Sequence, residues 1–120
     1  AIALGQAIRR ALGDKRGIER YGFCLPMDES QVQVALDFSG RFFLEFKADF
    51  PESHVGALPT DMVSHVFYSL AGRMKANLHI AGPGENPHHM VAACLQGFGR
   101  ALRQAIRRQG DEMPSTKGSL

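Results

Sequence analysis

The sequence predicts an α+β fold, with a mostly antiparallel sheet and helices packed on one face of it. Apolar and polar residues alternate over 32–38 and 42–48, which predicts two strands because successive strand side chains point to opposite faces. Apolar residues recur at helical spacing over 62–74 and 87–106, which predicts two core-packed helices. The order of these patterns is typical of the α+β class. Along the chain they run helix, strand, two paired strands, helix, strand, helix and tail.

The composition is that of one globular domain. At 120 residues, 44% of them apolar, the chain can build one core but is short for two domains. Its 14 Lys and Arg against 12 Asp and Glu give a net charge of +2, too small to indicate nucleic acid by itself. An anionic small molecule fits this charge equally well.

The sequence shows no membrane or export signal. No apolar run approaches the roughly 18 residues of a membrane span, and no basic-then-apolar leader opens the chain. Cys24 and Cys94 lie in apolar stretches without the short spacing of a zinc or redox motif. We therefore expect a soluble cytoplasmic protein with reduced thiols.

Residues 2–12 have the pattern of a helix without a start. Gly13 stands where helices commonly end, but no Ser, Thr, Asp or Asn precedes Ile2 to cap the first backbone N–H groups. We therefore expect the sequence to be the later part of a longer protein. The apolar stripe of this helix consists of Leu4, Ala7, Ile8, Ala11 and Leu12.

Strand signals fill the first half of the chain and recur once later. A short strand is predicted over 20–25. Ser39 and Gly40 separate the two alternating stretches, and a two-residue link of this kind predicts a β-hairpin. A further short strand is predicted over 76–80, with His79 on its outer face.

Both core-packed helices carry start signals. Thr60 is the expected cap of the first, with Asp61 in its first turn, and Asn86 caps the second, with Pro87 at its first position. The outer face of the second helix is basic. Since no aromatic side chains alternate with these cations, a solvated face is favoured over a nucleic-acid site. The cations are Arg100, Arg103, Arg107 and Arg108.

Two adjacent histidines, His88 and His89, fall on the first turn of the second helix. Neighbouring helical side chains point about 100° apart, so each ring suits a different ion or a different subunit. The positive end of the helix dipole keeps imidazole neutral and able to bind metal. Ala92 stands one turn later, and His65 lies off the apolar stripe of the preceding helix. The residues leave two interpretations open: ordinary exposed histidines, or a nitrogen-rich metal site without a carboxylate.

The polar stretch 110–120 predicts an irregular tail. Its hydroxyls, its cation and a permissive glycine suit a phosphate group, while the composition fits a frayed tail equally well. These groups belong to Ser115, Thr116, Lys117 and Gly118.

Five motifs, in order and correctly spaced, carry a resemblance to one enzyme family. They are G-D-K-R-G-I-E-R-Y-G at 13–22, L-D-F-S-G-R at 36–41, G-E-N-P-H-H at 84–89, G-R-A-L-R-Q-A-I-R at 99–107 and P-S-T-K-G at 114–118. With them the whole chain resembles imidazoleglycerol-phosphate dehydratase. That family has two similar halves, each with a paired-histidine motif at the head of a helix. The resemblance implies that 1–12 ends the first half, 19–109 forms the second repeat and 110–120 the tail.

The resemblance also implies an activity. It is that of a cytoplasmic lyase of histidine biosynthesis, which removes water from imidazole glycerol phosphate to give imidazole acetol phosphate. The family works as a homo-oligomer, with two manganese ions in sites that are shared between subunits. The proton that must leave carbon is poorly acidic, and a metal that holds the imidazole lowers the cost of the developing charge.

Site residues follow from the resemblance position by position. The metal ligands of the family's second half match His65, His88 and His89. The residues that hold the substrate phosphate match Arg20, Arg41, Ser115 and Lys117.

Two positions depart from the family pattern. The glutamate of the family's H-H-x-x-E motif is replaced by Ala92, and a phosphate-binding lysine four residues later is replaced by Gln96. The first-half motif, D-x-H-H-x-x-E-D, is not in the sequence. An alternative hypothesis is therefore a non-catalytic homologue or fragment that keeps the fold without the chemistry.

Overall fold

A computed structural model of the chain describes residues 1–24, 32–48, 50, 53–82 and 86–120. The described residues form a four-stranded sheet in the order β1-β2-β6-β3, a small separate pair β4-β5, and three helices. The helices are α1 (Ile2–Leu12), α2 (Asp61–Met74) and α3 (Pro87–Ala105). The strands are β1 (Tyr21–Cys24), β2 (Gln33–Asp37), β3 (Phe43–Lys47), β4 (His54–Val55), β5 (Leu58–Pro59) and β6 (Asn77–Ala81).

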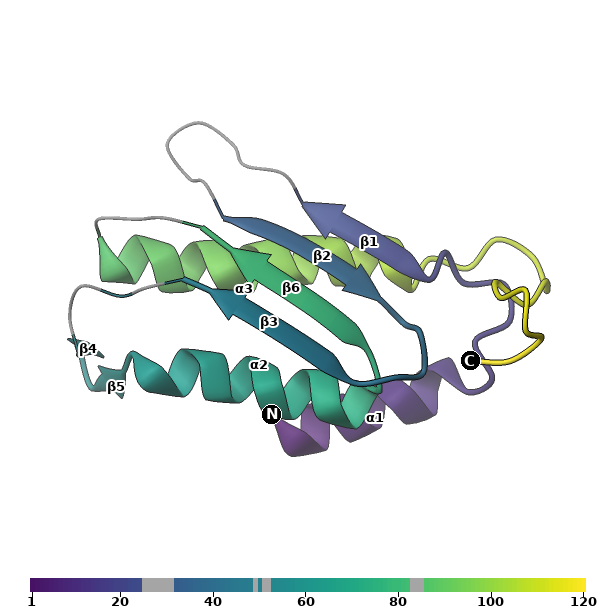
Figure 1. Cartoon of the computed structure of the whole chain (residues 1–120), viewed down its shortest axis with the longest axis horizontal. Coiled ribbons are helices and arrows are strands. Elements are labelled where there is room, and N and C mark those ends of the chain that lie inside the picture. The colour runs from purple at the N-terminus through teal and green to yellow at the C-terminus, as the bar shows by residue number, and fades with distance from the viewer. Residues whose placement is uncertain (25–31, 49, 51–52, 83–85) are drawn as a thin grey trace.

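The molecule has a sheet layer and a helix layer (Figure 1). Helix α3 packs under β1 and β2, α2 packs under β3, and α1 packs against α2 at the side. The predicted α+β class, with helices on one face of the sheet, is confirmed. None of the helices in the described part of the chain is long and apolar enough to cross a membrane.

The predicted hairpin at Ser39-Gly40 is wrong. Strand β6 lies between β2 and β3, antiparallel to β2 and parallel to β3, so the link after β2 crosses the end of β6 instead of joining neighbours. The strands still run in opposite directions, as in a hairpin. A period of two shows which face a strand buries but not which strand lies beside it, whereas the central place gives β6 two ladders of hydrogen bonds.

The core lies between the sheet and helices α2 and α3. Leu36, Leu78 and Leu44 stand side by side in register on the inner face. Beneath them the Phe67 ring lies 5.6 Å from that of Phe98, which joins the two helices. Phe67, Leu78 and Cys94 are fully buried. This continuous packing fixes the ends of the elements at which the predicted site residues lie.

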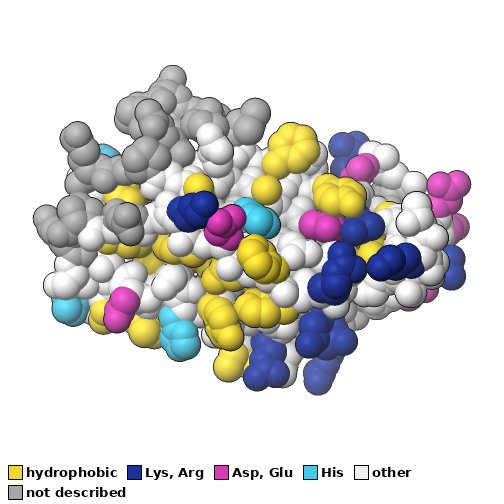
Figure 2. Space-filling view, viewed as in Figure 1, with side chains coloured by type: hydrophobic (Ala, Val, Ile, Leu, Met, Phe, Trp, Pro, Cys, Tyr) yellow, Lys and Arg dark blue, Asp and Glu magenta, His cyan; other side chains and the backbone are white. Residues whose placement is uncertain are grey.

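The outer face of the sheet is open in this chain. Tyr21, Phe23 and Phe43 stand there with 52%, 58% and 48% of their surface exposed. Figure 2 looks onto this face and shows hydrophobic side chains beside histidine and charged groups. Exposed apolar area of this kind is typical of a surface that meets another chain or segment.

The caps differ in how far the prediction holds. The side chain of Asn86 accepts hydrogen bonds from the backbone N–H groups of His88 and His89, at 3.0 and 3.2 Å, so this cap is confirmed. Thr60 occupies the cap position of α2 without a side-chain capping bond. Its backbone is helical (φ −68°, ψ −26°), whereas a capping side chain needs a non-helical residue. Helix α1 begins at Ile2 without a side-chain cap, as expected.

Gly22 determines how closely β1 approaches α3. A Cβ atom there would overlap the backbone carbonyl of Ala101. We predict that Gly22→Ala lowers the free energy of unfolding by about 3 kcal/mol, because two backbones must separate. Urea unfolding measures this change. The matched control is Gly99→Ala on α3. A Cβ atom there meets nothing within 4 Å, and helix propensity favours alanine by about 1 kcal/mol. Equal stability of the two variants would contradict the close approach.

The thiol of Cys94 is buried in the core. Burial raises its pKa to about 11, so roughly one thiol in a thousand is ionised at pH 8. We predict that native Cys24→Ser protein reacts with a disulfide reagent at pH 8 far more slowly than the same protein in urea. Cys94→Ser, which keeps the half-buried Cys24, serves as the comparison. Rapid reaction of native Cys24→Ser would show that the core opens.

Candidate functional site

Four segments meet at one end of the sheet, which is hereafter called the basic end. They are the loop after α1, the start of β1, the end of β2 and the tail 110–120, which folds back onto that loop (Figure 1). The backbone N–H of Gly17 donates to the carbonyl of Glu112 at 2.7 Å, and that of Gln109 donates to Gly17 at 2.6 Å. The tail is irregular, as predicted, but it is docked on the loop rather than frayed.

Arg20 is the central cation of the basic end. Its Nε and Nη2 donate to the two carboxylate oxygens of Asp37 at 2.6 and 3.3 Å, and its Nη1 donates to the carbonyl of Pro114 at 2.9 Å. The two side chains of this ion pair are only 14% and 22% exposed. Hydrogen bonding to Asp37 raises the pKa of the guanidinium, which is therefore charged at any working pH. A guanidinium has five N–H donors, so Arg20 keeps donors for an anion.

The backbone of Arg20 is held in an uncommon conformation. Its φ is +73°, in the left-handed region that non-glycine residues seldom adopt. Its N–H donates to the carbonyl of Ala105, and its carbonyl accepts from the N–H of Phe38, at 2.9 and 3.1 Å. Backbone strain of this kind persists where surrounding contacts hold it, and here they aim the guanidinium at Asp37 and the tail.

Lys15 is a buried cation that sequence reasoning missed. Only 5% of its surface is exposed, and its Nζ donates to the carbonyl of Leu120 at 2.9 Å. Burial, aided by repulsion from Arg9 and Arg20, lowers the pKa of this ammonium group. A lysine after a glycine-bounded helix end looks like a solvated loop residue, so the sequence offers no signal for its burial.

The other predicted phosphate-binding residues lie on segments that meet at the basic end. Ser115 follows Pro114, the residue held by Arg20, and its hydroxyl accepts from the N–H of Lys117 at 3.1 Å. The Lys117 ammonium has no ion pair with any described residue. Arg41 is exposed, and its N–H donates to the hydroxyl of Ser39 at 3.1 Å. Figure 2 shows Lys and Arg side chains gathered at this end of the molecule.

The paired histidines stand exposed at the opposite end of α3 from the tail. The rings of His88 and His89 have centroids 6.2 Å apart and planes inclined by 55°. Ala92 is half-buried one turn later and offers no ligand atom. This turn therefore presents imidazole nitrogens without a carboxylate of its own.

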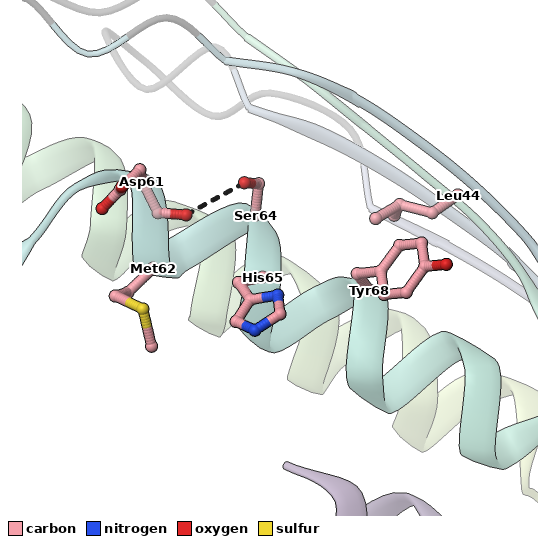
Figure 3. Close-up of a pocket in the computed structure, with 6 residues that line it drawn as sticks. All are labelled: Leu44, Asp61, Met62, Ser64, His65 and Tyr68. Carbon is pink, nitrogen blue, oxygen red and sulfur yellow. Dashed lines mark hydrogen bonds between the residues drawn. The ribbon is translucent and has the colours of Figure 1, made fainter.

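His65 lies on another helix and lines a different hollow. It projects from α2 beside Met62 and Tyr68, in a hollow of about 460 Å³ whose wall also includes Leu44 and Asp61 (Figure 3). The nearby Ser64 hydroxyl donates to the backbone carbonyl of Asp61 at 3.1 Å, so it is not aimed at His65. Neither His88 nor His89 lines this hollow.

The histidines do not complete a metal site within the described part of one chain. No group of three or more His, Cys, Asp or Glu side chains there is placed to hold a metal ion. The imidazoles have suitable chemistry, but manganese prefers a set of ligands that includes carboxylate oxygens. These residues by themselves do not fit a complete manganese centre.

His79 has a partner that could not be expected from the predicted hairpin. Because β3 lies beside β6, Glu45 stands opposite His79 and accepts from its Nδ1 at 3.0 Å. Lys47 contacts the same carboxylate at 2.8 Å. The hydrogen bond from Lys47 and then that from His79 lower the pKa of Glu45. This exposed trio is a surface network on the open face, and the predicted hairpin gave no reason to look for it.

A second basic surface follows the groove between α1 and α2. The groove has a volume of about 770 Å³. The rings of Phe42 and Tyr68 meet edge to face in its wall, with centroids 5.0 Å apart. Its cations are Arg9, Arg10, Arg73 and Lys75. None of these four forms an ion pair with a described residue, so the groove also attracts anions and any test of the basic end has to control for it.

The ion pair between Arg20 and Asp37 stabilises the basic end. We predict that Asp37→Asn lowers the free energy of unfolding by about 1–3 kcal/mol, because it leaves a largely buried guanidinium without its charge partner. Urea unfolding at neutral pH measures the change. The control is Asp14→Asn, whose pair with Arg16 is 62% and 54% exposed and contributes at most about 0.5 kcal/mol. Equal effects of the two substitutions would contradict a special role for Asp37.

The fold and the site define a class of protein: an α+β domain with a mixed sheet over helices and a basic end suited to a small anion. Sequence comparison is more specific. The family model for imidazoleglycerol-phosphate dehydratase matches residues 1–102. The "Histidine biosynthesis bifunctional protein HisB" of Legionella pneumophila subsp. pneumophila is 53% identical over 120 residues, and that of Stenotrophomonas maltophilia is 54% identical over 119 residues. The chain belongs to the imidazoleglycerol-phosphate dehydratase family.

Solved structures agree with this assignment. The imidazoleglycerol-phosphate dehydratase of Staphylococcus aureus subsp. aureus N315 matches with a TM-score of 0.85 and 34% identity, over 90% of this chain and 65% of that one. The enzyme from Pyrococcus furiosus, in complex with (S)-C348, matches with a TM-score of 0.82 and 33% identity, over 99% and 66%. The chain covers the same fold but spans about a third of the curated relatives, 34% for Legionella pneumophila and 33% for Stenotrophomonas maltophilia.

Proposed function

We propose that the chain is part of a lyase of histidine biosynthesis that dehydrates imidazole glycerol phosphate to imidazole acetol phosphate. Membership of the dehydratase family over residues 1–102 is the observation that carries this proposal. The basic end supports it, because a substrate phosphate needs convergent cations and hydroxyls. The mild net charge of +2 and the lack of any described helix that could span a membrane fit a cytoplasmic enzyme acting on a small anion.

In this proposal the substrate phosphate binds at the basic end. Arg20, fixed by Asp37, directs its remaining donors toward the anion. Arg41 and Lys117 add charge, and the Ser115 hydroxyl, which accepts from the backbone N–H of Lys117, keeps its own O–H as a donor. Charge-assisted hydrogen bonds of this kind are short and hold a dianion in one orientation.

The proposed cofactor is manganese, at a centre that the described residues of one chain do not complete. His65, His88 and His89 would each offer a neutral nitrogen, and carboxylate ligands would come from another segment or another subunit. An ion held there would supply Lewis-acid stabilisation of the negative charge that develops as a proton leaves carbon. The homo-oligomer that this sharing requires is supported by the exposed apolar groups of the sheet face and of α1.

A second candidate function rests on Ala92 and Gln96. Replacing a glutamate and a lysine of the family pattern removes both a charge at the metal and a contact to phosphate. A homologue that keeps the fold and its assembly surface without turnover is therefore the alternative. Measurable conversion of imidazole glycerol phosphate by the purified chain would eliminate it, since water gives no comparable rate.

Manganese content tests the proposed metal centre. We predict that manganese-reconstituted protein retains the metal in its size-resolved oligomer, where another subunit can supply carboxylate ligands, and that His65→Ala, His88→Ala and His89→Ala each reduce this amount. Elemental analysis per chain measures it. The control is His54→Ala, because this exposed histidine lies on β4 outside the proposed set. Manganese at background level in the unaltered protein would refute the metal centre.

Restoring the family's glutamate extends the same test. Ala92→Glu adds a carboxylate to the turn that follows the histidine pair, so we expect tighter manganese retention and turnover raised by about 100-fold. The comparison is Ala93→Glu, which adds the same charge to the same helix at a neighbouring position. An equal gain in both variants would show that net charge, not the position of the ligand, is responsible.

A further inference from the structure

Two cations of the basic end hold the tail on either side of its proposed phosphate-binding residues. Arg20 donates to the carbonyl of Pro114 and Lys15 to that of Leu120, each at 2.9 Å. Ser115 and Lys117 lie between these anchors. The tail has neither helix nor strand, so few bonds determine where it lies.

The segment between the anchors is a tight turn. The N–H of Lys117 donates to the Ser115 hydroxyl at 3.1 Å, and the N–H of Gly118 donates to the Ser115 carbonyl at 3.3 Å. Gly118 has a φ of +77°, which glycine adopts without steric cost. Two local hydrogen bonds hold the turn together, so fixing its two ends limits the directions that its side chains can take.

Lys15 makes this anchor under unfavourable conditions. It is 5% exposed and its backbone φ is +66°, in the region that favours glycine. Its Nζ donates to the backbone oxygen of Leu120, and burial lowers the pKa of its ammonium group. A strained backbone and a buried cation at one residue are each costly, and such costs concentrate where a structure must hold a functional group in place.

The far end of the tail also touches the segment that carries Arg41. A Cβ atom on Gly40 would overlap the carbonyl of Leu120, the same group that Lys15 binds. Gly40 has a φ of +82°, so this residue fits both the turn and the close approach. The backbone oxygen of Leu120 therefore contacts both the loop after α1, through Lys15, and the link after β2, through Gly40.

We propose that Lys15 is a positioning residue for the phosphate site: it holds the tail so that Ser115 and Lys117 lie beside Arg20. This inference rests on the proposed function for its ligand. In this proposal Lys15 does not contact the phosphate. Lys15 affects anion binding through the position of the tail, whereas a cation that acted only by its charge would not need the tail.

The test is a double-mutant cycle with inorganic phosphate as the probe. Calorimetric titration measures the dissociation constant for the unaltered chain, Lys15→Met, Lys117→Met and the double variant. Lys15→Met is expected to weaken binding about tenfold, the usual scale for one hydrogen bond to a charged group. In the Lys117→Met background the same substitution should change binding by less than about twofold. Equal effects in the two backgrounds would show that Lys15 acts by its own charge and overturn the proposal.

Two further variants keep this result interpretable. Lys15→Arg, which keeps the charge and donors, should restore most of the affinity. Arg73→Gln removes a cation from the groove between α1 and α2, and it should leave phosphate affinity at the basic end unchanged. A loss with Arg73→Gln as large as that with Lys15→Met would place the measured phosphate in the groove and overturn the inference.

Amide hydrogen exchange tests the anchor without any ligand. In Lys15→Met the amides of 115–118 should lose protection while those of β2 and β6 keep it. If Lys15→Met does not fold, Gly40→Ala displaces the Leu120 carbonyl from the other side and should expose the same amides. Unchanged protection of 115–118 would overturn the anchor. Absence of phosphate binding by the unaltered chain, with protection lost in Lys15→Met, would refute the proposed phosphate site but keep the anchor.

Discussion

The place of β6 between β2 and β3 determines most of this structure. Two ladders of hydrogen bonds hold it, and its inner residues Leu78 and Ile80 are 0% and 1% exposed. Because the link after β2 must then cross the end of β6, Gly40 is carried to the end of the sheet where the tail docks. The same pairing sets Glu45 opposite His79 on the outer face. One choice of neighbour thus shapes the basic end and the open surface together.

The basic end depends on a balance of charge rather than on cations alone. Asp37 neutralises part of the charge of Arg20 and fixes its orientation, while Lys15 donates to the backbone oxygen of Leu120 and is repelled by Arg9 and Arg20 more than Asp37 attracts it. A site without Asp37 would attract anions more strongly but would not hold the guanidinium in one direction. Asp37 thus fixes the direction of the Arg20 guanidinium but weakens its attraction for an anion. This compromise is expected of a site that must hold a phosphate in one orientation.

The sequence predicts local features of this molecule better than distant ones. The Asn86 cap and the outward face of His79 both follow from short-range rules that the structure confirms. The pairing of β3 with β6 was missed because alternation is the same for any neighbour. The burial of Lys15 was missed for a related reason, since its partner Leu120 is far away in sequence. Family resemblance supplied the site residues, which no periodicity could identify.

The carboxylate missing at position 92 determines what the histidine pair can do. His88 and His89 are neutral ligands, so they leave the charge of a divalent ion uncompensated. Imidazole ligands without carboxylates suit zinc, copper or nickel better than manganese, which binds such sites most weakly among the first-row divalent ions. In the proposed centre, selectivity for manganese would therefore depend on oxygen ligands from outside this turn. Ala92 is compatible with a metal centre. Which metal binds would then depend on the segment or subunit that supplies the carboxylate ligands.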